Sequence, residues 1–290
     1  MAQVAAENEE ALRAWNGVLF DRFLKFRHLF VGSVVAHSDA ALALHPPPRD
    51  GRALDIGCGF GDTTMQIAEL VGPAGSALGV DVAPRFVEQA REDAEQAGVA
   101  NVSFEIADVQ ATGFGETFDY AFSRFGTMFF ANPVPAFRNV CNALAPGGRL
   151  VMIVWRRRED NPWLFEAEQV VKPLIDEPEE TDEARCGPGP FSMANADTVS
   201  QMLLAAGFDG VELRRCDRPF RFGDDVQEAV EFNLALGPAA EAIRLAGPDG
   251  EAMRPQLAEL LRPVLRGFET PEGIVAASST WIVSAVSPRS

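Results

Sequence analysis

Apolar side chains in the first part of the chain follow the spacing of one helix face. Between residues 8 and 44 they recur every three or four positions, at Leu12, Trp15, Leu19, Phe23, Phe26 and Phe30. Such steps keep side chains on one side of an α-helix, so the pattern predicts helix over this range. The prolines at 46–48 then end it, because proline cannot continue a helix. Everything before Pro46 is therefore expected to be an addition to the domain that follows.

From Arg52 the pattern changes to short apolar runs that alternate with helical stretches. The apolar runs span residues 52–58, 76–82, 102–109, 118–125 and 149–155, and helical spacing covers 63–71, 85–98 and 133–145. Strands that alternate with helices at this spacing are typical of βαβ units, whose strands pair in parallel. The sequence therefore predicts an α/β fold with a doubly wound, mostly parallel sheet.

Beyond Trp155 the alternation is less regular. An acidic stretch rich in proline and glycine at 175–190 is typical of a solvated loop. A helix is expected over 195–207, with Asn195 or Asp197 near its cap and Gly207 as its stop. Strands are expected at 211–222 and 273–286, with helices across 224–268 between them.

Composition narrows the class of partner. The length of 290 residues and the hydrophobic content of 47% suit one α/β domain with additions. With 42 acidic against 25 basic residues the formal charge is −17, which opposes nucleic-acid binding because that binding rests on Lys and Arg. The N-terminus does not resemble a secretory signal, no apolar run nears the roughly 20 residues that cross a bilayer, and the four cysteines form no C-x-x-C pair. We expect a soluble, cytoplasmic protein with no metal and no membrane span.

A glycine-rich turn follows the first predicted strand in the segment LDIGCGFG, at 54–61. Such a turn lets a ligand approach the backbone, although the glycines alone leave phosphate, dinucleotide and simple packing open. Asp81 ends the second strand, where an acid can accept hydrogen bonds from both hydroxyls of a ribose, and Asp108 ends the third. Ligands bind outside the carboxyl ends of parallel strands, so these positions favour one nucleoside site. The G-x-G-x-G spacing departs from the dinucleotide fingerprint, and Asp55 would repel a pyrophosphate but attract an ammonium group.

Five segments in order along the chain resemble the motifs of the class I S-adenosylmethionine-dependent methyltransferases. The resemblance is to the small-molecule branch similar to the ubiquinone/menaquinone C-methyltransferases. The segments are LDIGCGFG, GVDVAPRFVEQAR at 79–91, ADV at 107–109, FDYAFSRFGTMFF at 118–130 and LAPGGRLVMIVW at 144–155. The likeness spans 50–156 closely, and 190–220 and 273–286 more loosely.

The resemblance implies a seven-stranded sheet of order 3-2-1-4-5-7-6 in which strand 7 is antiparallel. It divides the chain into an N-terminal helical cap (1–48), a Rossmann-like core (49–223), a helical insertion (224–270) and the last strand of the core (271–290).

The resemblance also implies S-adenosyl-L-methionine as the cofactor. The backbone of Gly57, Cys58 and Gly59 would lie against its methionine part, with Asp55 near the amino group, directly or through water. Asp81 would hold the ribose hydroxyls. The other implied contacts are Val82 against adenine, Asp108 at the adenine amino group, the backbone of Val109 at the adjoining ring nitrogen, and Ser123 near the methionine amine.

Methyl transfer from a sulfonium requires an aligned nucleophile and the exclusion of water, without a covalent enzyme intermediate. No general base is evident in the sequence. His28 and His37 are candidates that titrate near neutral pH, with surface or packing roles as alternatives. Arg124 would orient an anionic or phenolic oxygen, or pair with a loop acid. Because the chain has 21 Phe and one Tyr, an apolar substrate pocket is expected, formed by Phe20, Phe23, Arg124, Phe125, Met128, Phe129 and Trp163.

The expected function is methyl transfer to an oxygen, carbon or nitrogen of a small, largely apolar molecule by direct in-line displacement. A protein that binds S-adenosylmethionine without turnover is one alternative. A nicotinamide-dependent oxidoreductase is another, which the glycine spacing and Asp55 oppose. The sequence indicates neither the acceptor nor the oligomeric state.

Overall fold

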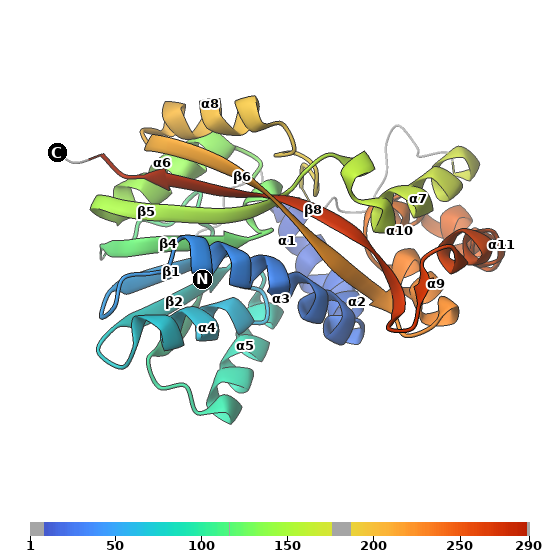
Figure 1. Cartoon of the computed structure of the whole chain (residues 1–290), viewed down its shortest axis with the longest axis horizontal. Helices are drawn as coiled ribbons and strands as arrows, with labels where there is room; N and C mark the ends of the chain where they lie inside the picture. Colours follow the sequence, from blue (N-terminus) through green and yellow to red (C-terminus); the bar gives the residue numbers. More distant parts are fainter. Residues whose placement is uncertain (1–8, 116, 176–186, 289–290) are drawn as a thin grey trace.

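The computed structural model describes residues 9–115, 117–175 and 187–288, and one twisted sheet runs through it (Figure 1). Its strands follow the order β3-β2-β1-β4-β5-β8-β6, and a short strand, β7, pairs with β8. The strands are β1 (Arg52–Ile56), β2 (Ser76–Asp81), β3 (Val102–Ile106), β4 (Phe118–Arg124), β5 (Leu144–Trp155), β6 (Asp209–Gly223), β7 (Glu269–Thr270) and β8 (Gly273–Val286).

The pairing directions confirm the predicted fold class and strand order. Strands β3, β2, β1, β4 and β5 pair in parallel. Strand β8 lies between β5 and β6 and is antiparallel to both. The predicted seventh strand is β8 in chain order, because an additional two-residue strand, β7, precedes it.

Several helices pack on the parallel part of the sheet and on β6, among them α3 (Arg27–Leu44), which packs on β5 and β6, and four others. These four are α4 (Asp62–Val71), α5 (Pro84–Ala97), α6 (Pro133–Ala143) and α8 (Ala196–Ala206). Their ends follow local chemistry: α5 begins with proline and ends at left-handed Gly98, and the Asn195 side chain accepts from the Thr198 N–H to cap α8. The helix expected over 133–145 ends earlier, because Leu144 already pairs with Phe118 in the sheet.

The N-terminal segment is a broken helix, and the prediction of one continuous helix over 8–44 is wrong. It comprises α1 (Glu9–Ala14), a π-helical turn η2 (Trp15–Leu19), α2 (Phe20–Lys25) and α3 (Arg27–Leu44). Gly17 takes a non-helical conformation that a larger residue would resist, and the backbone turns again at Phe26. Because such breaks rotate the helix face, the apolar side chains of this segment do not all point to one place.

Further helices lie at the end of the sheet where β6 and β8 extend beyond it (Figure 1). They are α7 (Pro162–Val171), α9 (Val226–Ala235), α10 (Pro238–Leu245) and α11 (Gly247–Arg266), and α7 contacts both α10 and α11. The range expected to be helical, 224–268, is thus divided, with one break at left-handed Gly237. The domain boundaries stay predictions, and most of the expected acidic loop, 176–186, lies outside the described residues.

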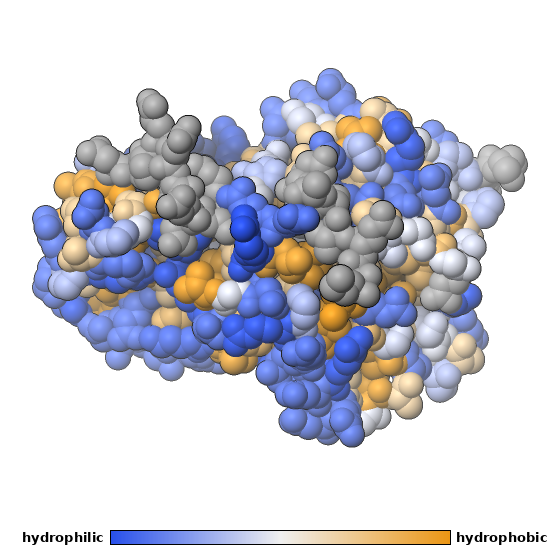
Figure 2. Space-filling view, turned by 180° about the vertical axis from the view of Figure 1, so that it is seen from behind, coloured by the Kyte–Doolittle hydropathy of each residue, from blue (hydrophilic) through white to orange (hydrophobic). Residues whose placement is uncertain are grey.

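The buried core follows the sheet from β2 across to β6. It includes the fully buried Phe122 of β4, Val151 and Met152 of β5, and Val283 of β8. The face seen from behind is mostly hydrophilic, with apolar residues showing in the middle of the molecule (Figure 2). Among the described helices, none combines the length and the apolar character needed to cross a membrane.

Candidate active site

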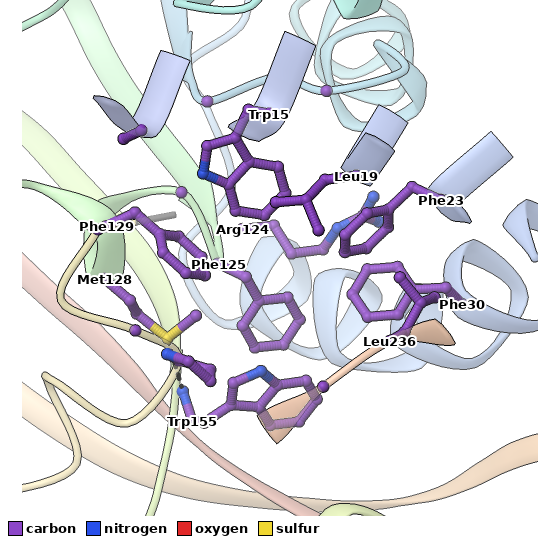
Figure 3. Close-up of a pocket in the computed structure, with 18 of the residues that line it drawn as sticks. Trp15, Leu19, Phe23, Phe30, Arg124, Phe125, Met128, Phe129, Trp155 and Leu236 are labelled. Carbon is purple, nitrogen blue, oxygen red and sulfur yellow. Dashed lines mark hydrogen bonds between the residues drawn. The ribbon is translucent and has the colours of Figure 1, made fainter. Parts of the chain in front are cut away.

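A cavity of about 490 Å³ opens at the carboxyl ends of the parallel strands. One part of its wall is the glycine turn after β1 together with the ends of β2 and β3. The other part is formed by the N-terminal helices, the ends of β4 and β5, and the helices α7, α9 and α10. Figure 3 shows Trp15, Leu19 and Phe23 facing Phe125 and Trp155 across it.

The three glycines of the turn have left-handed φ values but different surroundings. A Cβ atom at Gly57 would lie 2.9 Å from Cα of Gly126, so two backbones meet closely there. A Cβ at Gly61 would clash with the Phe104 ring, which indicates packing. At Gly59 no atom lies within 4 Å of the Cβ position. The turn is therefore held tightly on both sides and leaves open space at Gly59, in the cavity wall.

Asp81 ends β2 in the cavity wall, as predicted, and its carboxylate is fixed by backbone. Oδ2 accepts from the Gly59 N–H at 3.0 Å, and Oδ1 accepts from the Ala83 N–H at 3.0 Å. Burial raises the pKa of Asp81, while these backbone donors counteract the shift. Each oxygen has a further lone pair, so the carboxylate can still accept hydrogen bonds from a ligand.

The other predicted adenosine contacts gather beside Asp81. Val82, Asp108 and Val109 all line the same cavity. Asp108 is 3% exposed, and its Oδ1 accepts from the Gln110 N–H at 3.0 Å, which fixes the loop after β3. Gly57, Cys58 and Gly59 complete this part of the wall.

Asp55 and Ser123 do not line the cavity, contrary to expectation. Asp55 is 1% exposed, and the hydroxyls of Thr63 and Thr64 donate to its Oδ2, each at 2.7 Å. Burial raises the pKa of Asp55 to about 6. Ser123 is buried and donates to the carbonyl of Ile56 at 2.8 Å. Both residues therefore hold the glycine turn and α4 from behind.

Arg124 lies in the cavity wall and bridges two helices. Its Nη2 donates to both carboxylate oxygens of Asp62, at 3.0 and 2.7 Å, and its Nη1 donates to Oγ of Ser38 at 3.1 Å. The side chain of Arg124 is 9% exposed and that of Asp62 is 23% exposed. Of the two roles considered for Arg124, the ion pair is present, and it joins α3 of the N-terminal segment to the start of α4.

The apolar part of the cavity is built on aromatic rings. Phe125 stacks on Trp155 at 4.0 Å between ring centroids, and its backbone has the left-handed φ of 62°. That conformation is costly for a residue with a side chain, and the Phe125 N–H donating to Ile153 O at 3.0 Å helps to hold it. Trp15 packs edge-on against Phe129, with centroids 4.9 Å apart. These contacts give the wall a fixed, ring-lined shape (Figure 3).

Most residues of the predicted substrate pocket meet here, and one does not. Phe20 is not among the lining residues: its ring packs against Phe60 and Phe86, which themselves line the cavity. The cavity wall includes Phe23, Arg124, Phe125, Met128, Phe129 and Trp163.

Neither histidine proposed as a base lines the cavity. His28 is more than half exposed and pairs with Glu228 at 3.1 Å. His37 is fully buried between α3 and β8, where its ring nitrogens contact the hydroxyls of Ser278 at 2.8 Å and Thr280 at 3.1 Å. Within the described residues no group of three or more His, Cys, Asp and Glu side chains could hold a metal ion.

Several wall residues were not identified from sequence. Phe232 lies in α9 and Leu236 directly follows it, and no local pattern reveals that this helix lies over the cavity. Two of the missed residues carry a sequence signal. Asp62 directly follows the glycine turn, and Glu168 is an acid within a mostly apolar helical segment, PWLFEAEQVV, where it is only 5% exposed.

Comparisons with known proteins agree with this arrangement. A family model described as a methyltransferase domain matches residues 48–209. The aklanonic acid methyltransferase DauC of Streptomyces sp. (strain C5) is 35% identical over 105 residues, which cover 36% of this chain and 48% of that protein. The ubiquinone/menaquinone biosynthesis C-methyltransferase UbiE of Pseudomonas aeruginosa is 29% identical over 174 residues, 55% of this chain and 66% of that one. The chain thus spans about half to two thirds of the length of these relatives.

Solved structures share the fold at low identity. Phosphoethanolamine N-methyltransferase 2 of Haemonchus contortus, solved in complex with S-adenosyl-L-methionine, superposes with a TM-score of 0.58 at 19% identity, over 98% of this chain and 60% of that one. The YcgJ protein of Bacillus subtilis gives 0.54 at 17% identity, over 87% of this chain and all of that one. The family model covers more than half of the 290 residues, and its range holds all five motif segments. The chain therefore belongs to the methyltransferase domain family, as its motifs predict.

Proposed function

We propose that this chain is an S-adenosylmethionine-dependent methyltransferase that acts on a small, largely apolar acceptor. One observation carries the proposal: the positions predicted for adenosine and methionine share a single cavity with a wall of aromatic rings. A methyl donor at the glycine turn would then lie beside an apolar acceptor in the same cavity. The methyl group would be transferred to an oxygen, carbon or nitrogen atom of that acceptor.

The residues present fit this cofactor. Open space at Gly59 allows close approach to the backbone, and the Asp81 carboxylate retains acceptor capacity for two ribose hydroxyls. Val82, Asp108 and Val109 lie beside it, where the adenine is expected. Asp55, behind the turn, is separated from the cavity, so any effect on the methionine amine would be indirect.

The protein's own part in the reaction is positioning and exclusion of water. The bound cofactor would supply an electrophilic methyl group on its sulfonium. The rings of Phe125, Trp155 and Phe129 would hold an apolar acceptor in line with that group and keep water out. Arg124, already paired with Asp62, fixes the wall between the two halves of the cavity.

Calorimetry with S-adenosylmethionine, S-adenosylhomocysteine and NAD tests the proposal. We expect the first two to bind and NAD not to bind; binding of NAD alone would overturn it. Asp81→Ala should weaken the adenosylmethionine complex by about 1–3 kcal/mol, because ribose hydroxyls would lose their acceptor. Glu105→Gln, a change at an exposed acid on neighbouring β3, is the matched control and should leave affinity unchanged.

Turnover separates the leading proposal from the alternative of binding alone. Conversion of S-adenosylmethionine to S-adenosylhomocysteine should appear with some member of an aromatic acceptor panel. We further propose that the protein has no nucleic-acid partner, because its net charge is −17. We also propose a cytoplasmic location, since the four cysteines form no C-x-x-C pair.

A further inference from the structure

The N-terminal helices place an arginine in the wall of the cavity. Arg22 belongs to α2, and it lines the cavity. It lies three positions after Leu19 and directly before Phe23, and both of these side chains face the cavity in Figure 3. Residues three positions apart are neighbours on one face of a helix, so Arg22 lies on the face that Leu19 presents to the cavity.

The guanidinium of Arg22 forms no hydrogen bond within the described residues. Its ion-pair partner is Glu251 of α11, whose Oε1 lies 3.7 Å from Nη2, beyond hydrogen-bond distance. Nη1 is enclosed and has no partner. Nε and Nη2 are not enclosed, and the side chain as a whole is 15% exposed. Two nitrogens of Arg22 are therefore both unpaired and accessible.

The acids nearest in charge to Arg22 are already bound by other arginines. Arg254 donates to both oxygens of Glu251, and Arg244 donates to both oxygens of Glu241, at 2.9 and 2.8 Å. Burial lowers the pKa of Arg22, with Arg254 adding to the shift and Glu251 opposing it. A guanidinium stays protonated at neutral pH, so this wall holds a largely buried positive charge whose counter-ion is shared.

We propose that Arg22 binds a carboxylate group of the acceptor molecule. Nε and Nη2 lie along one edge of the guanidinium and donate in parallel, which matches the two oxygens of a carboxylate. A group with a single negative charge suits the site, because Glu241 and Glu251 lie nearby and would repel a second charge. This inference rests on the proposed function for its setting and adds a specificity requirement: the acceptor is an acid with an apolar body.

The cofactor also carries a carboxylate, at its methionine end, and the position of Arg22 favours the acceptor as the source. The methionine part is expected at the glycine turn, along Gly57, Cys58 and Gly59. The charged neighbours of Arg22 are instead Glu241 of α10 and Glu251 of α11. Helix α10 belongs to the part of the wall that lies opposite the cofactor positions.

Calorimetry with naphthoate and naphthamide tests the proposal, each probe being added to protein saturated with S-adenosylhomocysteine. The two probes share their rings and a planar head group, but only naphthoate is charged. The wild type should bind naphthoate about tenfold or more tightly than naphthamide, because a charge-assisted hydrogen bond is stronger than a neutral one. Arg22→Met keeps an apolar stem but removes the guanidinium, so it should abolish this preference.

Lys25→Gln is the matched control. Lys25 lies on the same helix, pairs with Glu231 at 2.9 Å and is 61% exposed. Removal of its positive charge should keep the preference for naphthoate. Glu251→Gln is a second, independent variant at an acid whose side chain is 47% exposed. It removes the competing carboxylate, so the preference should increase by about threefold.

A separate arm distinguishes the carboxylate of the cofactor. Methylthioadenosine contains the nucleoside and the sulfur of the cofactor but not its carboxylate. If Arg22→Met weakens S-adenosylhomocysteine and leaves methylthioadenosine unchanged, Arg22 binds the cofactor and the proposal is overturned. Equal affinity of the variant and the wild type for both compounds supports the acceptor as the source.

The proposal is also overturned if the wild type binds naphthoate and naphthamide equally, or binds neither while S-adenosylhomocysteine binds. The same holds if Arg22→Met, shown to be folded by its affinity for methylthioadenosine, keeps the preference. If Arg22→Met does not fold, Glu251→Gln decides, and an unchanged preference in that variant overturns the proposal. Failure of the wild type to bind S-adenosylhomocysteine would instead count against the proposed function.

Discussion

His37 links the N-terminal helices to the sheet and should make the stability of the protein depend on pH. Its imidazole is fully buried between α3 and β8, and its edge meets the Trp155 ring. Burial lowers its pKa to about 4, with Arg218 and Arg124 adding to the shift and Asp217 opposing it. The hydroxyls of Ser278 and Thr280 are its hydrogen-bond partners.

The magnitude follows from the two pKa values of the imidazole. In the unfolded chain His37 titrates near 6.5, and in the folded protein near 4. Between these values the unfolded chain binds more protons, so acidification favours unfolding. The contribution of His37 to the free energy of unfolding is complete above about pH 6.5 and is lost as pH falls through 4. At roughly 1.4 kcal/mol per pKa unit, this contribution amounts to about 3 kcal/mol.

Urea unfolding of the wild type and of His37→Gln at a series of pH values measures this contribution. The difference in free energy of unfolding between them should shrink by about 3 kcal/mol from about pH 7 to about pH 4. The contributions of the other titrating groups cancel in this difference, because both proteins contain them. A difference for His37→Gln that stays constant with pH would refute the reasoning.

Other parts of the site give predictions on the same urea assay. Gly57→Ala should lower the free energy of unfolding more than Gly59→Ala. Both substitutions incur about 1–2 kcal/mol of strain from the left-handed backbone, but only the Cβ at position 57 also clashes with backbone atoms. Equal losses of stability would contradict this. Arg124→Leu should lower the free energy of unfolding by about 2 kcal/mol, because it leaves the Asp62 carboxylate without its ion-pair partner. Adding Asp62→Asn should restore part of that stability, and no restoration would argue against the ion pair. Burial raises the pKa of Asp55 to about 6, so the folded protein holds that proton more tightly than the unfolded chain does. The free energy of unfolding of the wild type should therefore fall by about 3 kcal/mol as pH rises from about 4 to above 6, and Asp55→Asn should abolish this fall. An unchanged pH profile in Asp55→Asn would contradict this reasoning.

The parallel half of the fold could be predicted because each element carries its own local signal. Apolar runs mark β1 to β5, and Asn195 and Gly207 mark the ends of α8. The N-terminal helix was predicted as continuous because its apolar spacing survives through Gly17 and Phe26, while the breaks depend on backbone conformation. Packing against the rest of the protein, which a period of three or four residues does not encode, decides where such a helix bends.

The cofactor side of the site was more accessible to sequence reasoning than the acceptor side. Asp81 and Asp108 end consecutive strands, so topology alone brings them together. Asp55 fits the same rule but points behind the turn, because two threonines of α4 capture its carboxylate. Residues such as Trp15, Trp163 and Leu236 come from segments far apart in the chain, and only the folded arrangement shows that they share one cavity.

The position of β8 also bears on how the chain is made. Strand β6 ends at Gly223 and has no strand partner in the described structure except β8, which begins at Gly273. During synthesis β6 must therefore wait for a segment translated about fifty residues later, a delay of several seconds at roughly 5–20 residues per second. In that interval the edge of β5 is unpaired and open to wrong partners. The rate of elongation through 224–272, or a chaperone that shields that edge, would then control the yield of folded protein.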